Sequence, residues 1–276
     1  MLSYQHAYHA GNFADVHKHA LLCLALTLLQ RKPAPLACLE THAGRGSYNL
    51  EGDAARRSGE WRDGIGRLWA TADAPADLLP YLDAVRAANS GKLARYPGSP
   101  ALVRHLLRAD DRAVLMELHP HEGAELKALY RGDRQVAVHL RDGFEGLPPL
   151  VPPATRRGLV LVDPSYEVKE DYAAVPALVQ QAHRRWPGGS YLVWYPLLAA
   201  GRERRLREAF RRSGMRPILD TQLVVARAGR GMHGSGLLVV NPPWPLAERW
   251  APLGDWLATR LARETGHATS DWLVPE

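Results

Sequence analysis

The strongest constraint on the fold is a short apolar segment that stops at an acidic residue followed by proline. Residues 158–162 read Gly-Leu-Val-Leu-Val, and Asp163 and Pro164 follow directly. A continuous aliphatic run of this length is typical of a buried strand. Pro164 has no N–H and disfavours helical geometry for Asp163, so we expect the strand to end there. In open α/β sheets, ligands bind at this carboxyl end of the strands.

The four residues after this strand bring together a carboxylate, a rigid carbonyl and an aromatic ring. Asp163-Pro164-Ser165-Tyr166 resembles the (Asp/Asn)-Pro-Pro-(Tyr/Phe/Trp) signature of methyltransferases that act on exocyclic amino groups of bases. Ser165 replaces the second proline, but both hydrogen-bond acceptors are kept. An ordinary turn is the alternative interpretation.

Apolar runs and helical patterns alternate along most of the chain, which predicts an α/β fold. The expected strands are residues 36–40, 113–118, 136–140, 158–162, 190–194, 223–226 and 236–240. The expected helices are residues 15–30, 101–108, 123–130, 172–185 and 202–212. Asp15 is the expected cap of the first helix. The arginine-rich helix 202–212 either contacts phosphate or presents a solvated face.

One segment interrupts this alternation and predicts an insertion. Residues 49–96 contain prolines, arginines and aromatic residues, and they favour short helices such as 78–88 over strands. We therefore expect a main domain formed by residues 1–48 and 97–276, with 49–96 as a helical subdomain. The insertion is either a lobe that presents arginines and aromatics to RNA or a packing subdomain with a solvated basic face.

A glycine-containing turn follows the first expected strand. Residues 40–46 read Glu-Thr-His-Ala-Gly-Arg-Gly. A dinucleotide-binding fingerprint would have a third glycine where Asn49 stands. The turn instead resembles the acidic-x-x-x-Gly-x-Gly form that holds S-adenosylmethionine. Many other strand–turn–helix loops also carry Gly-x-Gly.

Acidic residues at the ends of the next two expected strands are candidate ligands for a nucleoside. Glu117 ends the second strand, where a carboxylate commonly binds ribose hydroxyls. Asp142 follows the third strand and could accept a hydrogen bond from an adenine amino group, with Gly143 leaving room for the ring. A plain Asp-Gly turn is the alternative. Ser99 is the expected cap of a helix that Pro100 begins.

A second signature-like tetrapeptide competes with the first. Asn241-Pro242-Pro243-Trp244 matches the amino-methyltransferase signature better than Asp163-Pro164-Ser165-Tyr166 does. We favour Asp163 because the fourth strand should lie beside the first in such sheets, next to the glycine turn. Asn241 follows the seventh expected strand, farther from that turn.

Composition limits the classes of protein. The chain of 276 residues has 46% hydrophobic content, enough for one large domain or one domain with an insertion. It shows no signal peptide and no apolar stretch long enough to cross a bilayer. Cys23 and Cys38 lie among apolar neighbours, typical of free thiols in a cytoplasmic protein, and no spacing indicates a metal site. The net charge of +6 mildly favours polyanions such as nucleic acid.

Taken together, the ordered motifs resemble one family along nearly the whole chain, the RlmJ family of bacterial 23S ribosomal RNA adenine-N6 methyltransferases. The segments that carry the resemblance are residues 9–19, 40–46, 96–100, 117–120, 142–143, 163–166, 241–244 and 266–269. Two positions depart from the pattern: Glu40, where aspartate is usual, and Ser165.

The resemblance implies a Rossmann-like methyltransferase fold, with a small helical insertion between the first two strands, that uses S-adenosylmethionine. It implies that Asp163 is the catalytic residue and that Tyr4 contacts the RNA substrate. Partners would be 23S ribosomal RNA, protein-free or in an early assembly intermediate, with no metal and no membrane. The implied cofactor contacts are His19, His42, Ser99, Glu117, Asp142, Gly143 and Asp163.

The expected chemistry follows from the poor nucleophilicity of the adenine amine. Asp163 and the Pro164 carbonyl would accept its N–H bonds, and Tyr166 would stack on the base. Three alternatives remain: a nicotinamide-dependent dehydrogenase, disfavoured by the missing glycine; a DNA adenine-N6 methyltransferase; and a non-catalytic RNA-binding protein, which leaves the ordered acids unexplained.

Overall fold

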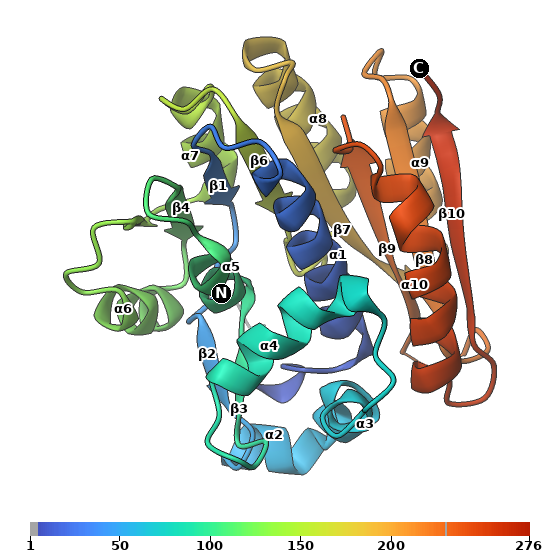
Figure 1. Ribbon diagram of the computed structural model, residues 1–276. Helices are drawn as coiled ribbons and strands as arrows, with labels where there is room; N and C mark the ends of the chain where they lie inside the picture. Colours follow the sequence, from blue (N-terminus) through green and yellow to red (C-terminus); the bar gives the residue numbers. More distant parts are fainter. Residues whose placement is uncertain (1–4, 230) are drawn as a thin grey trace.

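An eight-stranded sheet organises the computed structural model, which describes residues 5–229 and 231–276 (Figure 1). Its strands are β1 (Ala37–Glu40), β4 (Arg112–Glu117), β5 (Val136–Leu140), β6 (Gly158–Val162), β7 (Ser190–Leu198), β8 (Ile218–Val224), β9 (Met232–Val240) and β10 (His267–Val274). They pair in the order β10-β8-β9-β7-β6-β1-β4-β5. The predicted α/β class is confirmed, and so is the expectation that the fourth strand lies beside the first.

The sheet has a parallel half and an antiparallel half. Strands β5, β4, β1, β6 and β7 run parallel, so their carboxyl ends meet at one edge. Strands β9, β8 and β10 pair antiparallel, beginning with β9 against β7. Strand β10 was not predicted, because several of its side chains are exposed and it shows no apolar run.

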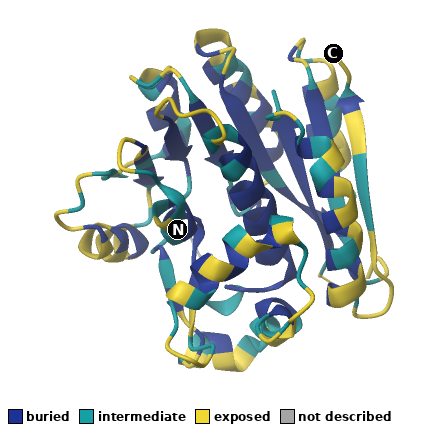
Figure 2. Cartoon of the chain, in the orientation of Figure 1, coloured by how far each residue is buried: buried dark blue, intermediate teal, exposed yellow. Residues whose placement is uncertain are grey.

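Helices cover both faces of the sheet and enclose two apolar cores. The first face carries α1 (Phe13–Gln30), α5 (Ser99–Leu106) and α10 (Leu246–Leu261), and the second carries α7 (Gly143–Leu150), α8 (Asp171–Arg185) and α9 (Glu203–Arg211). Alternation along β6 joins the cores, since Leu161 packs in the first and Val160 and Val162 in the second. Figure 2 shows these central strands and α1 as largely buried. The helix α6 (Pro120–Leu129) lies beside β5.

The first helix begins earlier than predicted. Asn12, not Asp15, is its cap, and the Asn12 side chain accepts from the backbone N–H groups of Ala14 and Asp15. Asp15 is thereby left inside the first turn with its carboxylate free to bind side chains. A short 3₁₀ segment, η1 (His6–Tyr8), precedes the helix.

The insertion between β1 and β4 is mainly helical, framed by a two-stranded ribbon that was not predicted. The ribbon pairs β2 (Ser47–Asn49) with β3 (Arg95–Pro97). Between them lie α2 (Asp53–Ser58), η2 (Glu60–Asp63), α3 (Ile65–Leu68), η3 (Ala76–Leu78) and α4 (Leu79–Ala87).

The aromatic residues of this insertion pack inward. Tyr81 and Tyr96 are fully buried, and Trp61 and Trp69 pack against the first core. The insertion therefore shares its core with α1 and does not present a row of aromatic rings to solvent. This arrangement favours the packing interpretation over an aromatic RNA-facing lobe.

Within residues 5–229 and 231–276, none of the helices is both long and apolar enough to span a membrane.

Candidate active site

A large cavity lies at the carboxyl edge of the parallel strands. Its volume is about 670 Å³, within the range of small-molecule and cofactor sites. Every described residue that was predicted to bind cofactor or substrate lines it: His19, His42, Ser99, Glu117, Asp142, Gly143, Asp163 and Tyr166. Tyr4 lies outside the described residues.

The glycine turn and the end of β4 are joined by one carboxylate. Glu117 accepts from the backbone N–H of Gly44 at 2.8 Å and from that of His119 at 2.7 Å. Gly44 has a φ of +62°, and a Cβ there would lie 2.4 Å from the Tyr48 hydroxyl, so the turn requires glycine. Burial raises the pKa of Glu117, and these two N–H groups oppose the shift. The carboxylate is thus held rigidly at the cavity wall.

Asp142 and Gly143 begin the helix α7. One Asp142 carboxylate oxygen accepts from the Phe144 N–H at 2.8 Å, as a helix cap does. A Cβ on Gly143 would lie 2.1 Å from the Thr41 carbonyl oxygen. Glycine is therefore required for the close approach of α7 to the end of β1, and not only to leave room for a ligand. The Asp142-Gly143 turn that begins α7 thus also forms part of the cavity wall.

Ser99 does not cap its helix. Gly98 occupies the cap position of α5, and the Ser99 hydroxyl donates instead to Glu40 at 2.6 Å. Burial raises the pKa of Glu40 to about 8, and its second carboxyl oxygen has no hydrogen-bond partner among the described residues. The departure from aspartate at position 40 therefore places a longer carboxyl group, protonated below about pH 8, behind the glycine turn.

Two histidines at the cavity are held in neutral form. Burial lowers the pKa of His19 to about 3 and that of His42 to about 4. The Nδ1 atom of His19 lies 2.7 Å from the Tyr96 hydroxyl, and that of His42 lies 2.8 Å from the Thr41 hydroxyl. Both rings can offer a hydrogen bond to a ligand without adding charge.

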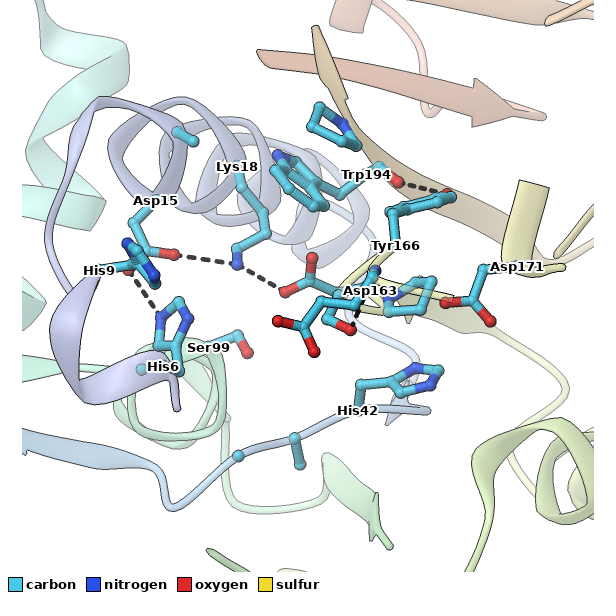
Figure 3. A pocket seen from close by; sticks show the side chains of 18 of the residues that line it. His6, His9, Asp15, Lys18, His42, Ser99, Asp163, Tyr166, Asp171 and Trp194 are labelled. Carbon is cyan, nitrogen blue, oxygen red and sulfur yellow. Dashed lines mark hydrogen bonds and ion pairs between the residues drawn. The ribbon is translucent and has the colours of Figure 1, made fainter. Parts of the chain in front are cut away.

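Asp163 is paired with a lysine from the first helix (Figure 3). The Lys18 ammonium lies 2.5 Å from Asp163 Oδ2 and 3.0 Å from Asp15 Oδ1, and all three side chains are largely buried. Burial raises the pKa of Asp163, opposed by the Lys18 charge. Burial also lowers the pKa of Lys18, but the two carboxylates outweigh this and raise it. In this group of three side chains, the Lys18 ammonium thus pairs with both carboxylates.

This pairing was not predicted. The sequence places Asp15 and Lys18 three residues apart, so they share one face of a helix, which was the only available signal. Asp15 also accepts from the Gly11 N–H at 2.9 Å and lies 3.0 Å from His6 Nε2. Asp15 thus ties the start of the chain to the lysine that contacts Asp163.

Tyr166 is oriented by the neighbouring strand β7. Its hydroxyl donates to the Trp194 carbonyl at 2.8 Å, its ring lies 4.6 Å from that of Tyr172, and only 4% of the residue is exposed. The Trp194 indole N–H in turn donates to the Ser235 hydroxyl at 2.9 Å. The stacking of Tyr166 on a base stays a prediction, and Trp194 is a second aromatic ring at the same wall.

The competing tetrapeptide lies at the opposite edge of the sheet. Because β9 is antiparallel to β7, Val240 at its end pairs with Tyr191 at the beginning of β7. The Asn241 side chain donates to the Gly189 carbonyl at 3.3 Å, and the backbone carbonyl of Asn241 accepts from the Ser190 hydroxyl. Asn241 does not line the cavity, whereas Asp163 does.

No group of three or more histidine, cysteine or acidic side chains is placed to hold a metal ion in the part of the chain that the structure describes. Cys23 and Cys38 are both buried free thiols.

Comparison with known proteins gives a consistent result. The family model described as "Ribosomal RNA large subunit methyltransferase D, RlmJ" matches residues 33–274. Two proteins named ribosomal RNA large subunit methyltransferase J, from Escherichia coli and Haemophilus influenzae, are 42% and 40% identical over the full length of both chains. A crystal structure of a Legionella pneumophila protein is 34% identical, with a TM-score of 0.90 over 96% of this chain and 98% of that one.

Proposed function

The chain belongs to the RlmJ family of large-subunit ribosomal RNA methyltransferases, and we propose that it transfers a methyl group from S-adenosylmethionine to N6 of an adenine in 23S ribosomal RNA. The observation that carries this proposal is the position of Asp163. It directly follows β6, which pairs with β1, and it lines the same cavity as Glu117 and Asp142. Asp163, which would accept a hydrogen bond from the adenine amine, therefore lies in the same site as the expected cofactor ligands.

The polar side chains of the cavity suit the binding of S-adenosylmethionine. Glu117 presents a fixed carboxylate where ribose hydroxyls bind, and Asp142 lies at the next strand end along the sheet. Glu40 has one carboxyl oxygen with no hydrogen-bond partner in residues 5–229 and 231–276, and His19 and Ser99 line the cavity. When bound, the sulfonium supplies an activated methyl group with a good leaving group. The protein's part is to position the adenine amine in line with it.

Asp163 and Pro164 would activate the amine. The N6 lone pair of adenine is delocalised into the ring, and hydrogen bonds from its two N–H groups to Asp163 and the Pro164 carbonyl favour a pyramidal nitrogen. Positive charge develops on that nitrogen during transfer, and the Asp163 carboxylate stabilises it. Lys18 occupies Oδ2 of Asp163, which leaves Oδ1 for the substrate. Lys18 thereby fixes the carboxylate and favours its ionised form.

The aromatic wall would receive the base. Tyr166 and Trp194 line the cavity on the side of Asp163, and an adenine must leave its stack to enter. Tyr4 contacts the RNA in this proposal on the strength of the family resemblance. We place the reaction in the cytoplasm, on protein-free 23S RNA or an early assembly intermediate.

The experiment is methyl transfer from labelled S-adenosylmethionine to protein-free 23S RNA, with duplex DNA that contains adenine as the competing substrate. We expect label in N6-methyladenine of the RNA and none in the DNA. Label only in DNA would make the chain a DNA methyltransferase, and the absence of transfer to either would sink the proposal.

A further inference from the structure

Arg202 is a cation at the wall of a cavity whose other charged side chains are mostly carboxylates. It follows β7 and occupies the cap position of α9. Among the described residues that line the cavity, the only lysine or arginine side chains are Lys18 and Arg202. Lys18 is already neutralised by Asp15 and Asp163. Of these two side chains, Arg202 is therefore the one that can offer a positive charge to a ligand there.

Three of the other arginines at this helix form ion pairs elsewhere, and Arg204 and Arg205 do not line the cavity. Arg207 pairs with the buried Asp220 at 2.6 Å, and Arg211 and Arg212 both pair with Glu208. Within residues 5–229 and 231–276, Arg202 forms no ion pair with an acidic group. A cation at the beginning of a helix also opposes the helix dipole, so helix stability does not explain its position.

The strand order assigns Arg202 to the substrate half of the cavity. Glu117 ends β4 and Asp142 follows β5, on one side of β1. Asp163 follows β6, on the other side of β1, and Arg202 follows β7, one strand farther. The lining residues nearest to it along the chain are the apolar Pro196 and Leu198, also from β7. Asp163 thus lies between the expected cofactor ligands and Arg202.

We propose that Arg202 is a substrate-positioning residue that binds a backbone phosphate of the RNA at or next to the target adenosine. A guanidinium matches phosphate through two parallel N–H donors, which sets orientation as well as affinity. Such a contact lets the enzyme hold the nucleotide while its base occupies the wall formed by Tyr166 and Trp194. The inference rests on the proposed function, because it needs RNA as the substrate.

Salt dependence tests the phosphate contact. Arg202→Gln should raise KM for 23S RNA about tenfold or more, as expected for a lost charge-assisted hydrogen bond, with the loss falling on KM rather than kcat. It should also flatten the slope of log Kd against log salt by about 0.7, the value for one phosphate contact on a single strand. Affinity for S-adenosylmethionine should stay at the wild-type value.

Arg211→Gln is the matched control, since it removes one arginine from the same helix at its solvent-exposed end. It should leave KM and the salt slope at wild-type values. Arg202→Lys should restore the slope, because the charge is kept, but not the full affinity, because the paired donors are lost.

Small ligands locate the phosphate. Adenosine, adenosine 5′-monophosphate and adenosine 3′-monophosphate are compared as inhibitors of RNA methylation. In the wild type, one monophosphate should inhibit more strongly than adenosine, and Arg202→Gln should abolish that difference. An unchanged KM and salt slope in Arg202→Gln, or weakened S-adenosylmethionine binding, would overturn the assignment. Failure of the wild type to methylate RNA would instead reject the proposed function.

Discussion

The ammonium of Lys18 lies 2.5 Å from the carboxylate of Asp163, although 145 residues separate them in the chain. The same ammonium is 3.0 Å from Asp15, so one cation forms ion pairs with two buried carboxylates. Removing charges from water is costly, and such groups persist only when each is paired. The group therefore holds the acid that the proposed reaction needs, through one lysine that pairs with both carboxylates.

Asp163→Ala should lower single-turnover methyl transfer to RNA by about 100-fold or more, because the amine loses its charged acceptor. The protein should remain folded, as Asp15 still neutralises Lys18. The loss of stability should then be smaller than the ~3–5 kcal/mol typical of a buried charge left unpaired. Thermal melting measures that loss.

Asn241→Ala is the control for the competing tetrapeptide. Its side chain holds only the turn at the opposite sheet edge, through the Gly189 carbonyl. We expect wild-type transfer rates with a small loss of stability. Loss of transfer in a folded Asn241→Ala protein, together with an active Asp163→Ala protein, would reverse the catalytic assignment.

Asp15→Asn tests whether Asp15 positions Lys18. The asparagine can still accept from the Gly11 N–H, but it removes the charge that Lys18 shares. We expect kcat to fall by about tenfold, equivalent to ~1.4 kcal/mol of transition-state stabilisation, with unchanged S-adenosylmethionine affinity. The Asp15 charge raises the pKa of Asp163, so the acid limb of the pH–rate profile should move to lower pH. A lower rate with an unmoved profile would indicate a purely structural role.

Glu40→Gln tests the buried carboxyl behind the glycine turn. The folded protein raises the pKa of Glu40 from 4.5 to about 8, so the native state holds a proton that the unfolded chain releases. The stability from this group is fully present below pH 4.5 and is lost as pH rises through 8.

Chemical denaturation across pH 5 to 9, without cofactor, measures this effect. The wild type should lose up to about 4 kcal/mol relative to Glu40→Gln, which stays neutral throughout. Parallel stability curves for the two proteins would mean that Glu40 is ionised in the fold.

Glu117→Ala tests the cofactor assignment. A carboxylate–hydroxyl hydrogen bond contributes about 1.5–3 kcal/mol, so affinity for S-adenosylmethionine should fall by roughly 10- to 100-fold. Titration calorimetry measures this affinity, and NAD is the control ligand that should not bind. Because Glu117 also holds the Gly44 and His119 N–H groups, Glu117→Gln serves as the milder variant. Tight NAD binding by the wild type would contradict the assignment.

The local pattern of apolar residues was sufficient to predict the central strands and the strand ends that line the cavity. Residues 136–140 and 158–162 form strands with the predicted bounds, and Pro164 gives the reason why the second strand stops at Val162. The turn chemistry was equally local: Gly44 needs a left-handed backbone, and Asp142 begins a helix.

Elements stabilised by distant contacts were missed or misread. Strand β10 pairs along the outer edge of β8, and Leu273 is its single buried residue. Ser99 has the sequence of a cap, yet its hydroxyl binds Glu40, 59 residues away. In both cases the contact that determines the structure is made with a residue or strand far away in the sequence, so the neighbouring residues do not reveal it.

The motifs along the chain indicated a methyltransferase of nucleic acid through their combined resemblance to the RlmJ family, whereas each motif alone left an ordinary turn as the alternative. The choice between Asp163 and Asn241 depended on strand direction, because an antiparallel β9 carries Asn241 to the far edge. The Lys18–Asp163 pair and the free charge of Arg202 depended on packing, since charges far apart in sequence interact only after the fold brings them within a few ångströms and removes the water between them.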